Sequence, residues 1–245
     1  MNNEQILKCF SFHATHECLP RTRILTFDNG KNNCRKKMLD AKKKYKVPIL
    51  NYFIGENKFQ IVINGNSTDV TNIVRYVSSI TAAEYSQRTE YEPPFWKPKY
   101  NLTLIQNGIH LLRLSLMLDR IMIDKETSLH QADYVFSGYR ELTGIKSRYT
   151  IANIKVMAKL TGFKNESDFR LWYIGHASTI SENVASILSK VREATFIGGK
   201  DEMREVANLF ARNKKIELIV PDDKLPTYAL FLPKKRRRIF TRSLK

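Results

Sequence analysis

The hydrophobic and polar positions of the first 118 residues alternate between the period of a strand and the period of a helix. Short segments with two-residue alternation or a continuous apolar run predict strands, and longer segments with apolar residues three and four apart predict helices. Asn66 and Ser67 precede one helical run and supply a cap. The predicted order is strand 9–16, helix 32–46, strands 49–54 and 59–63, helix 69–87, strand 100–106 and helix 109–118.

This order predicts an α+β fold of the ferredoxin-like split βαβ kind, in which an antiparallel sheet carries two helices on one face. From about residue 144 onward the pattern is helical almost throughout. The predicted helices there are 152–160, 167–175, 182–193 and 200–212. We therefore expect an α+β domain over residues 1–143, a C-terminal helical domain over 144–232 and a basic tail over 233–245, which contains the run KKRRR.

Positive charge is the strongest compositional feature. The 245 residues include 41 Lys and Arg against 24 Asp and Glu, which gives a formal net charge of +17. Lysine and arginine gain affinity for phosphates through the release of counterions, and strongly basic domains are typical of nucleic-acid binding. The charge predicts a nucleic-acid partner, with a merely soluble basic protein as the alternative.

Several classes of protein do not fit the sequence. No segment approaches the ~18 consecutive apolar residues of a membrane helix, and the polar N-terminus with Glu4 does not resemble a secretory signal. Cys9, Cys18 and Cys34 lack the spacing of a zinc cluster or a disulfide framework. We expect no membrane partner, no cofactor and no metal, and a cytoplasmic, nucleoid-associated protein.

Two further patterns have ordinary structural interpretations beside the functional ones. His13 and His16 would face opposite sides of a strand, so a shared metal ion is disfavoured. Residues 151–160 and 166–175, joined around Gly162, have helix-turn-helix spacing, which plain helical bundles also show. Whether these C-terminal helices read bases stays open at this point.

Five strings, in order along the chain, resemble the HUH single-strand transposases, the family of insertion-sequence and REP-associated tyrosine transposases. The clearest is DYVFSGYRELTG at residues 133–144, which resembles the family's DYPWSSYRELxG. The others are FHAT at 12–15, AKKKYK at 41–46, NYFIGENKFQIV at 51–62 and FWKPKYN at 95–101. The likeness extends over most of residues 9–210, and it implies the split βαβ fold and a DNA partner.

The metal ligands that the resemblance implies are absent from the matching positions. The family holds a divalent ion with two histidines separated by one residue, because positions i and i+2 of a strand share a face. Lys58 and Gln60 stand at those positions, and the chain contains no HxH string. A lysine places a positive charge where a cation would bind, and an amide is a poor replacement for an imidazole.

The nucleophile that the resemblance implies is absent as well. The matching position is Met117, or Leu114 with one small gap, and no tyrosine occurs between Tyr100 and Tyr134. A covalent phosphotyrosine intermediate requires that hydroxyl. We therefore interpret the chain as a catalytically inactive, transposase-like protein with no catalytic residues.

Basic residues in two of the resembling strings, and just beyond one of them, are candidates for contact with DNA. Trp96 lies among lysines after two prolines, where an aromatic ring suits base stacking, although it suits a core position equally well. A second group surrounds the turn at Gly144. The predicted nucleic-acid-binding residues are Trp96, Lys97, Lys99, Arg140, Lys146 and Arg148.

The sequence thus favours an inactive, transposase-derived DNA-binding protein that regulates transcription. Duplex DNA is the favoured partner and hairpin DNA is also open. The family includes dimers, so the resemblance leaves a homodimer open. Two alternatives remain: a metal-dependent enzyme that nicks single-stranded DNA with substituted ligands, and a binder of structured RNA.

Overall fold

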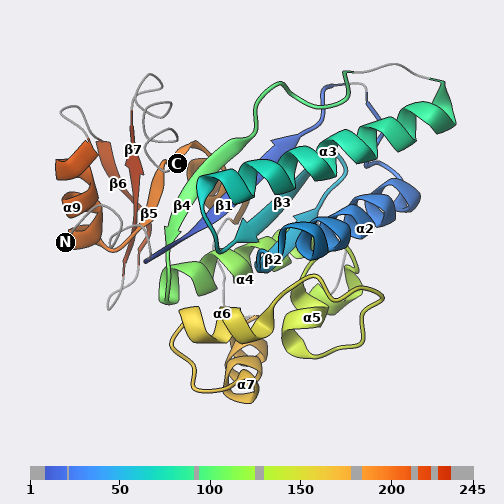
Figure 1. The fold of residues 1–245 in the computed structure, drawn as a ribbon. Coiled ribbons are helices and arrows are strands. Elements are labelled where there is room, and N and C mark those ends of the chain that lie inside the picture. The colour runs from blue at the N-terminus through green and yellow to red at the C-terminus, as the bar shows by residue number, and fades with distance from the viewer. Residues whose placement is uncertain are drawn as a thin grey trace.

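A computed structural model describes residues 9–20, 22–90, 94–124, 130–177, 184–210, 215–221 and 226–232. It is a mixed α/β structure built around one seven-stranded sheet (Figure 1). In chain order the elements are β1 (Phe10–Glu17), α2 (Asp28–Tyr45), β2 (Ile49–Ile54), β3 (Lys58–Ile63), α3 (Ser67–Thr89), β4 (Asn101–Gln106), α4 (Ile109–Asp124), η1 (Gln131–Asp133), α5 (Tyr139–Thr143), α6 (Ile154–Leu160), α7 (Glu166–His176), α8 (Val184–Glu193), β5 (Phe196–Gly198), α9 (Lys200–Phe210), β6 (Lys215–Val220) and β7 (Thr227–Phe231). None of the helices described is both long and apolar enough to cross a lipid bilayer.

The strands follow the order β2-β3-β1-β4-β5-β7-β6 across the sheet. All neighbouring pairs are antiparallel except β4 and β5, which are parallel. The central strand β1 pairs on both sides, with Phe12 opposite Ile63 of β3 and Leu104 of β4. All six residues of β2 are buried, which explains why its sequence is a nearly continuous apolar run.

Helices cover both faces of the sheet. In Figure 1, α2 and α3 lie side by side over one face, and α4 lies against the other, with α5, α6 and α7 beyond it. A capping box begins α3, because the Asn66 side chain accepts from the Asp69 N–H and the Asp69 carboxylate accepts from the Asn66 N–H. The N-terminal elements are those predicted from the sequence, with boundaries shifted by a few residues.

The C-terminal region differs from the sequence-based prediction. The expectation of a helical C-terminal domain over 144–232 is wrong in part, because β5, β6 and β7 lie in this range beside α6 to α9 and extend the sheet beyond β4. β5 has three residues, which are too few to show a period, and β6 and β7 have six and five residues and are not separated in the sequence from the helical pattern around them. The predicted basic tail over 233–245 lies outside the described residues.

The outer edge of β2 is covered by the chain that follows α4. Ser137 forms an isolated bridge with Phe53, and Ala152 forms one with Ile49. Between these bridges the short helix α5 ends at Gly144, which adopts a left-handed conformation with φ of 84°. Covering an edge strand in this way removes unpaired backbone groups from solvent.

Candidate functional site

A buried polar cluster lies on the β1 and β3 strands, on the positions that the transposase resemblance singles out. Nε2 of His13 donates to Oε1 of Gln60 at 3.1 Å, and the Thr15 hydroxyl donates to the same oxygen at 3.3 Å. Thr15 and Gln60 are direct cross-strand partners. His13, Thr15 and Gln60 are 1%, 2% and 3% exposed, respectively. The amide oxygen of Gln60 is therefore committed to two internal donors.

Burial and a nearby positive charge keep the His13 imidazole of this cluster neutral. Burial, reinforced by the positive charge of Lys58, lowers the pKa of His13 to about 4, although the Gln60 hydrogen bond opposes the shift. The imidazole is consequently neutral at pH 7. Nδ1 of His13 and Nε2 of Gln60 have no hydrogen-bond partner among the described residues. Within the same part of the chain, no three His, Cys, Asp or Glu side chains gather closely enough to hold a metal ion.

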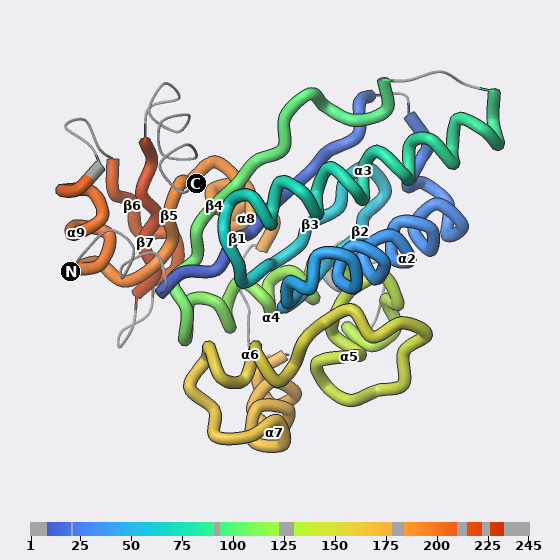
Figure 2. The backbone as a smooth tube through the Cα atoms, in the orientation of Figure 1, coloured from blue at the N-terminus to red at the C-terminus, as the bar shows by residue number. Residues whose placement is uncertain are grey.

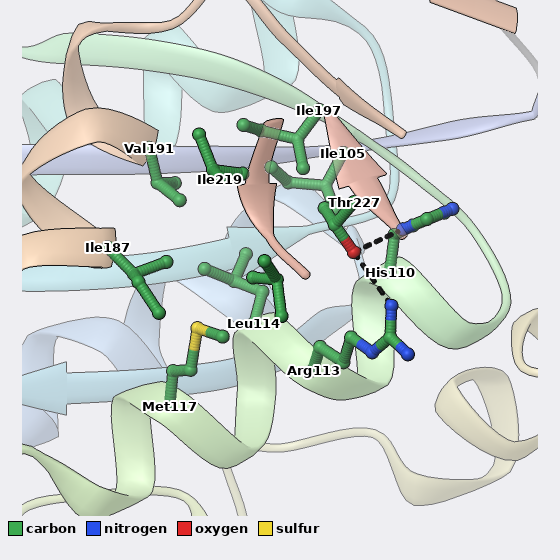
Figure 3. A pocket seen from close by; sticks show the side chains of 11 residues that line it. Ile105, His110, Arg113, Leu114, Met117, Ile187, Val191, Ile197, Ile219 and Thr227 are labelled. Carbon is green, nitrogen blue, oxygen red and sulfur yellow. Dashed lines mark hydrogen bonds between the residues drawn. The ribbon is translucent and has the colours of Figure 1, made fainter. Parts of the chain in front are cut away.

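The two positions that match the family's nucleophile face α8. Leu114 and Met117 of α4 are buried and line a small apolar cavity together with Ile187 and Val191 of α8 (Figure 3). The cavity has a volume of about 10 Å³, which is room for one water molecule at most. Neither Leu114 nor Met117 carries a hydroxyl or another nucleophilic group.

Polar side chains at one end of this cavity are bound to one another. The guanidinium of Arg113 donates to the Thr227 hydroxyl at 2.8 Å, and Nδ1 of His110 lies 3.0 Å from the same oxygen (Figure 3). Burial, followed by the nearby charge of Arg113, lowers the pKa of His110 to about 4. These contacts join α4 to β7 and serve the packing of the C-terminal strands.

A second buried polar network connects β2, α4 and α7. The Tyr173 hydroxyl donates to Oδ2 of Asp119 at 2.6 Å, and Nδ2 of Asn51 donates to the same atom at 3.4 Å. Burial raises the pKa of Asp119 to about 7, although these hydrogen bonds oppose the shift. Gly138 is required beside it, because a Cβ there would lie 2.1 Å from Oδ1 of Asn51. The network is a structural junction whose charge depends on pH.

Glu17 joins three elements at one end of β1. Its carboxylate forms ion pairs with Lys97, which precedes β4, and with Arg192 of α8. Burial alone would raise the pKa of Glu17, but the hydrogen bond from Lys97 and the charge of Arg192 outweigh it and hold the pKa below its usual value. Part of the charge of Lys97 is thereby neutralised within the molecule.

The structure corrects the predicted role of Trp96. The indole is 9% exposed, its Nε1 donates to the backbone oxygen of Ser78 in α3 at 2.9 Å, and its ring stacks on His16 with centroids 5.0 Å apart. Phe59 contacts the same ring edge-on. An indole held in this way is part of the core, so stacking of Trp96 on a base does not fit the structure.

The predicted basic residues fall into two separate groups. Lys97 and Lys99 are exposed and precede β4, at the top of Figure 1, whereas the turn after α5 lies at the bottom. In that turn Lys146 and Arg148 are exposed. Arg140 is half-buried, and its guanidinium donates to the backbone oxygen of Lys146 at 2.8 and 3.2 Å. Arg140 therefore shapes the turn, and Lys97, Lys99, Lys146 and Arg148 are the predicted side chains that are exposed.

Basic residues of α2 lie beside the second group, and the sequence-based selection omitted them. The run of lysines in α2 is visible in the sequence as a solvated basic helix face. Its place next to the turn after α5 depends on contacts between residues more than 100 positions apart. No local pattern in the sequence signals such a contact.

The predicted helix-turn-helix corresponds to α6 and α7. Asn165 caps α7, and Glu166 and Asp168 occupy its first turn. Leu171 and Ile174 are 73% and 48% exposed on the same helix. Acidic groups at the beginning of a reading helix would oppose DNA phosphates, so this pair offers a poor surface for base recognition.

Comparisons with known proteins add little to this geometry. No protein-family model matches the chain, and no curated protein matches it. Among solved structures, the chain is similar to a REP-associated tyrosine transposase bound to a REP hairpin. The two share 11% sequence identity with a TM-score of 0.44, over 60% of this chain and 89% of the other. A likeness of this size is weak, and the proposals below rest on the chain's own residues.

Proposed function

We propose that this protein binds nucleic acid without cleaving it. The observation that carries the proposal is the net charge of +17 on a chain of 245 residues, together with lysines and arginines that are exposed in the folded chain, among them Lys99, Lys146 and Arg148. Such a surface gains affinity for phosphates through the release of counterions. Double-stranded DNA is the proposed partner, with a DNA hairpin as a second form.

The topology supports a transposase-like origin. The antiparallel order β2-β3-β1-β4, with α2 and α3 over one face, is that of a ferredoxin-like split βαβ unit. We propose that residues 9–106 form this unit, that β5, β7 and β6 extend its β4 edge, and that the chain after α4 covers its β2 edge. The transposase-like strings of the sequence fall within this unit and the segment that follows it.

The polar face of the sheet supports the absence of strand cleavage. Gln60 accepts two internal hydrogen bonds, and Lys58 brings a positive charge to the same place. Leu114 and Met117 turn toward α8. A protein that keeps a DNA-binding fold and lacks the cleavage groups is suited to occupy a DNA site, so we propose a regulator of transcription that acts at the nucleoid in the cytoplasm.

The test combines binding with a search for covalent chemistry. The purified protein is mixed with duplex DNA, hairpin DNA, single-stranded DNA and an RNA hairpin, each in the presence of Mg²⁺ or Mn²⁺. We expect binding to DNA that weakens with salt, and no protein–DNA band that survives denaturation. A denaturation-resistant band would favour the nicking enzyme. Binding to the RNA hairpin alone would favour the structured-RNA binder.

Sequence specificity and oligomeric state need separate measurements. Mapping of bound DNA in cells is expected to show discrete sites near promoters if the protein regulates transcription, whereas uniform coverage would contradict that role. Light scattering with and without a palindromic duplex tests the homodimer, which is expected to appear as a two-to-one complex.

A further inference from the structure

The helix α2 and the turn after α5 form one continuous surface. In Figure 2, the segment that links α5 to α6 runs alongside α2. Nη2 of Arg35 donates to the Ser147 hydroxyl at 2.9 Å, and Nζ of Lys42 donates to the backbone oxygen of Thr150 at 3.0 Å. The Arg35 guanidinium also lies over the Tyr149 ring, 5.2 Å from its centroid. These contacts fix the turn against the helix.

Cations dominate the exposed part of this surface. Lys36 and Lys43 are exposed and seven residues apart on α2, which places them on the same side about 10 Å apart along the helix. Lys46 follows at the end of α2, and Lys146 and Arg148 belong to the fixed turn. We call these five exposed residues, Lys36, Lys43, Lys46, Lys146 and Arg148, the α2 basic face.

The acidic groups nearby are engaged within the molecule. Asp28 and Asp40 of α2 lie within 3.6 and 4.0 Å of Lys31 and Lys37 of the same helix. The Glu141 carboxylate accepts from the backbone N–H groups of Ile151 and Ala152 and from a tyrosine hydroxyl. Glu84 of α3 also lies within the electrostatic reach of Lys36, but its carboxylate is paired with Lys37 at 2.5 Å. The positive charge of the α2 basic face therefore remains available to an external anion.

The aromatic rings at this surface are contacted by the protein's own cations. Arg35 and Arg148 both lie over Tyr149, at 5.2 and 5.3 Å from its centroid. Lys44 lies over Tyr45 and Tyr76, at 5.5 and 4.9 Å. Proteins that bind single strands need free rings on which bases stack, whereas a paired helix presents its phosphates outward. The surface suits the second kind of ligand.

We infer that the α2 basic face binds the phosphate backbone of a paired nucleic-acid stem. The inference rests on the proposed function, and it assigns that function to a surface formed by two segments distant in the sequence. Lys36, Lys43, Lys146 and Arg148 make the phosphate contacts. Arg35 and Lys42 are positioning residues, because they hold the turn against α2.

The test compares two variants of equal net charge. The first variant combines Lys36→Gln, Lys43→Gln, Lys146→Gln and Arg148→Gln. The control combines Lys155→Gln, Lys159→Gln, Lys164→Gln and Lys200→Gln, four exposed lysines of α6, the turn before α7, and α9. Binding to a 20-base-pair DNA duplex and to one of its single strands is measured at several salt concentrations.

The full-length wild type is expected to prefer the duplex. The logarithm of the binding constant falls linearly with the logarithm of the salt concentration. For B-DNA, the slope of this line becomes steeper by about 0.9 for each phosphate that the protein neutralises. The first variant is therefore expected to show a slope shallower by roughly 3 to 4 units, and the control one shallower by less than about 1. The thermal unfolding midpoints of both variants should match that of the wild type. The double variant Lys36→Gln with Lys43→Gln leaves the turn unchanged. Its slope is expected to change by half as much as that of the four-residue variant.

The outcomes separate this inference from the proposed function. If the wild type binds neither probe, the proposed function fails, and the inference fails with it. If the wild type binds DNA and the two variants weaken equally, the function stands and the location on α2 is wrong. Tighter binding of the single strand by the wild type would overturn the preference for a paired stem.

Discussion

The two faces of the sheet differ in the side chains that they bury. On the face covered by α2 and α3, Phe12 and Ala14 of β1 point into an apolar core, and His16 stacks on Trp96. On the opposite face, His13 and Thr15 of the same strand lie in hydrogen-bonded clusters. One face is stabilised by packing, and the other depends on buried hydrogen bonds, although Nδ1 of His13 and Nε2 of Gln60 have no partner among the described residues.

The polar face is also closed by a contact with α8. Gln60 lies on this face, and the Thr103 hydroxyl donates to the backbone oxygens of Val191 in α8 and of Ala194 just after it, at 2.8 and 3.0 Å. The polar face at β4 is thus a buried contact with the end of α8, whereas the exterior of α2 is basic.

The largest effect on stability is expected from Trp96→Ala on the apolar face. Removing a buried tryptophan leaves a cavity and costs about 3–5 kcal/mol of unfolding free energy. Urea denaturation measures the change, and Trp172→Ala on α7, where the ring is only partly buried, is the control with a smaller expected loss. A loss below about 1 kcal/mol for Trp96→Ala, together with weaker DNA binding, would indicate that Trp96 is exposed and contacts DNA.

On the polar face, Asp119→Asn is expected to change the pH dependence of stability. The pKa of Asp119 is raised from 3.8 to about 7 in the folded protein, so the folded state binds the proton more tightly than the unfolded state. The contribution of the protonated Asp119 carboxyl to the unfolding free energy is complete below pH ~4 and is lost as pH rises through ~7. At about 1.4 kcal/mol per pKa unit, this shift corresponds to a loss of about 4 kcal/mol of unfolding free energy between low and high pH.

Thermal or urea unfolding from pH 4 to pH 8 measures this effect. The unfolding free energy of the wild type minus that of Asp119→Asn is expected to decrease from pH 4 to pH 8. Asp119→Asn should therefore compare more favourably with the wild type at pH 8 than at pH 4. An unchanged difference at every pH would show that Asp119 ionises normally. Tyr173→Phe serves as a companion, because it removes one donor to the carboxylate and should move the transition to higher pH.

A smaller effect is expected from Gln60→Leu, which removes the acceptor for His13 and Thr15. Loss of one partner from a buried hydrogen bond costs about 1–3 kcal/mol. The double variant His13→Leu with Gln60→Leu is expected to be less destabilised than the sum of its parts, since both polar groups are then gone. Strict additivity in the double-mutant cycle would mean that the two side chains do not interact.

The smallest effect is expected from Lys97→Ala at the end of β1. Ion pairs with a half-exposed lysine contribute less than about 1 kcal/mol, and Arg192 remains to neutralise Glu17. DNA affinity should also change little, because the charge of Lys97 is partly neutralised. A large loss of affinity with an altered salt slope would place the DNA near β4 and away from the α2 basic face.

The sequence was sufficient for the elements with a strong and long pattern. β2 was predicted with its observed bounds, and α3 was predicted to within two residues at each end. The continuous apolar run of β2 and the helical period of α3 are both features of the local sequence. β5, with three residues, has too few positions for any period, and its strand conformation comes from pairing with β4 and β7.

The candidate site was less predictable for a similar reason. Trp96 has lysines and prolines around it, and only its contacts with Ser78 and His16 place it in the core. Arg140 and Arg148 have similar sequence surroundings, yet one binds a backbone oxygen and the other is exposed. Such distinctions are set by tertiary contacts, which charge and spacing do not encode.

The parallel pairing of β4 with β5 has a consequence for protein synthesis. Roughly 90 residues separate the two strands, and ribosomes add about 5–20 residues per second. The hydrogen-bonding edge of β4 around Leu104 and Ile105 therefore stays open on the nascent chain for about 5–20 s after β4 has emerged. An open edge is a template for pairing with another chain, so nascent or truncated chains that end before β5 should aggregate or recruit chaperones.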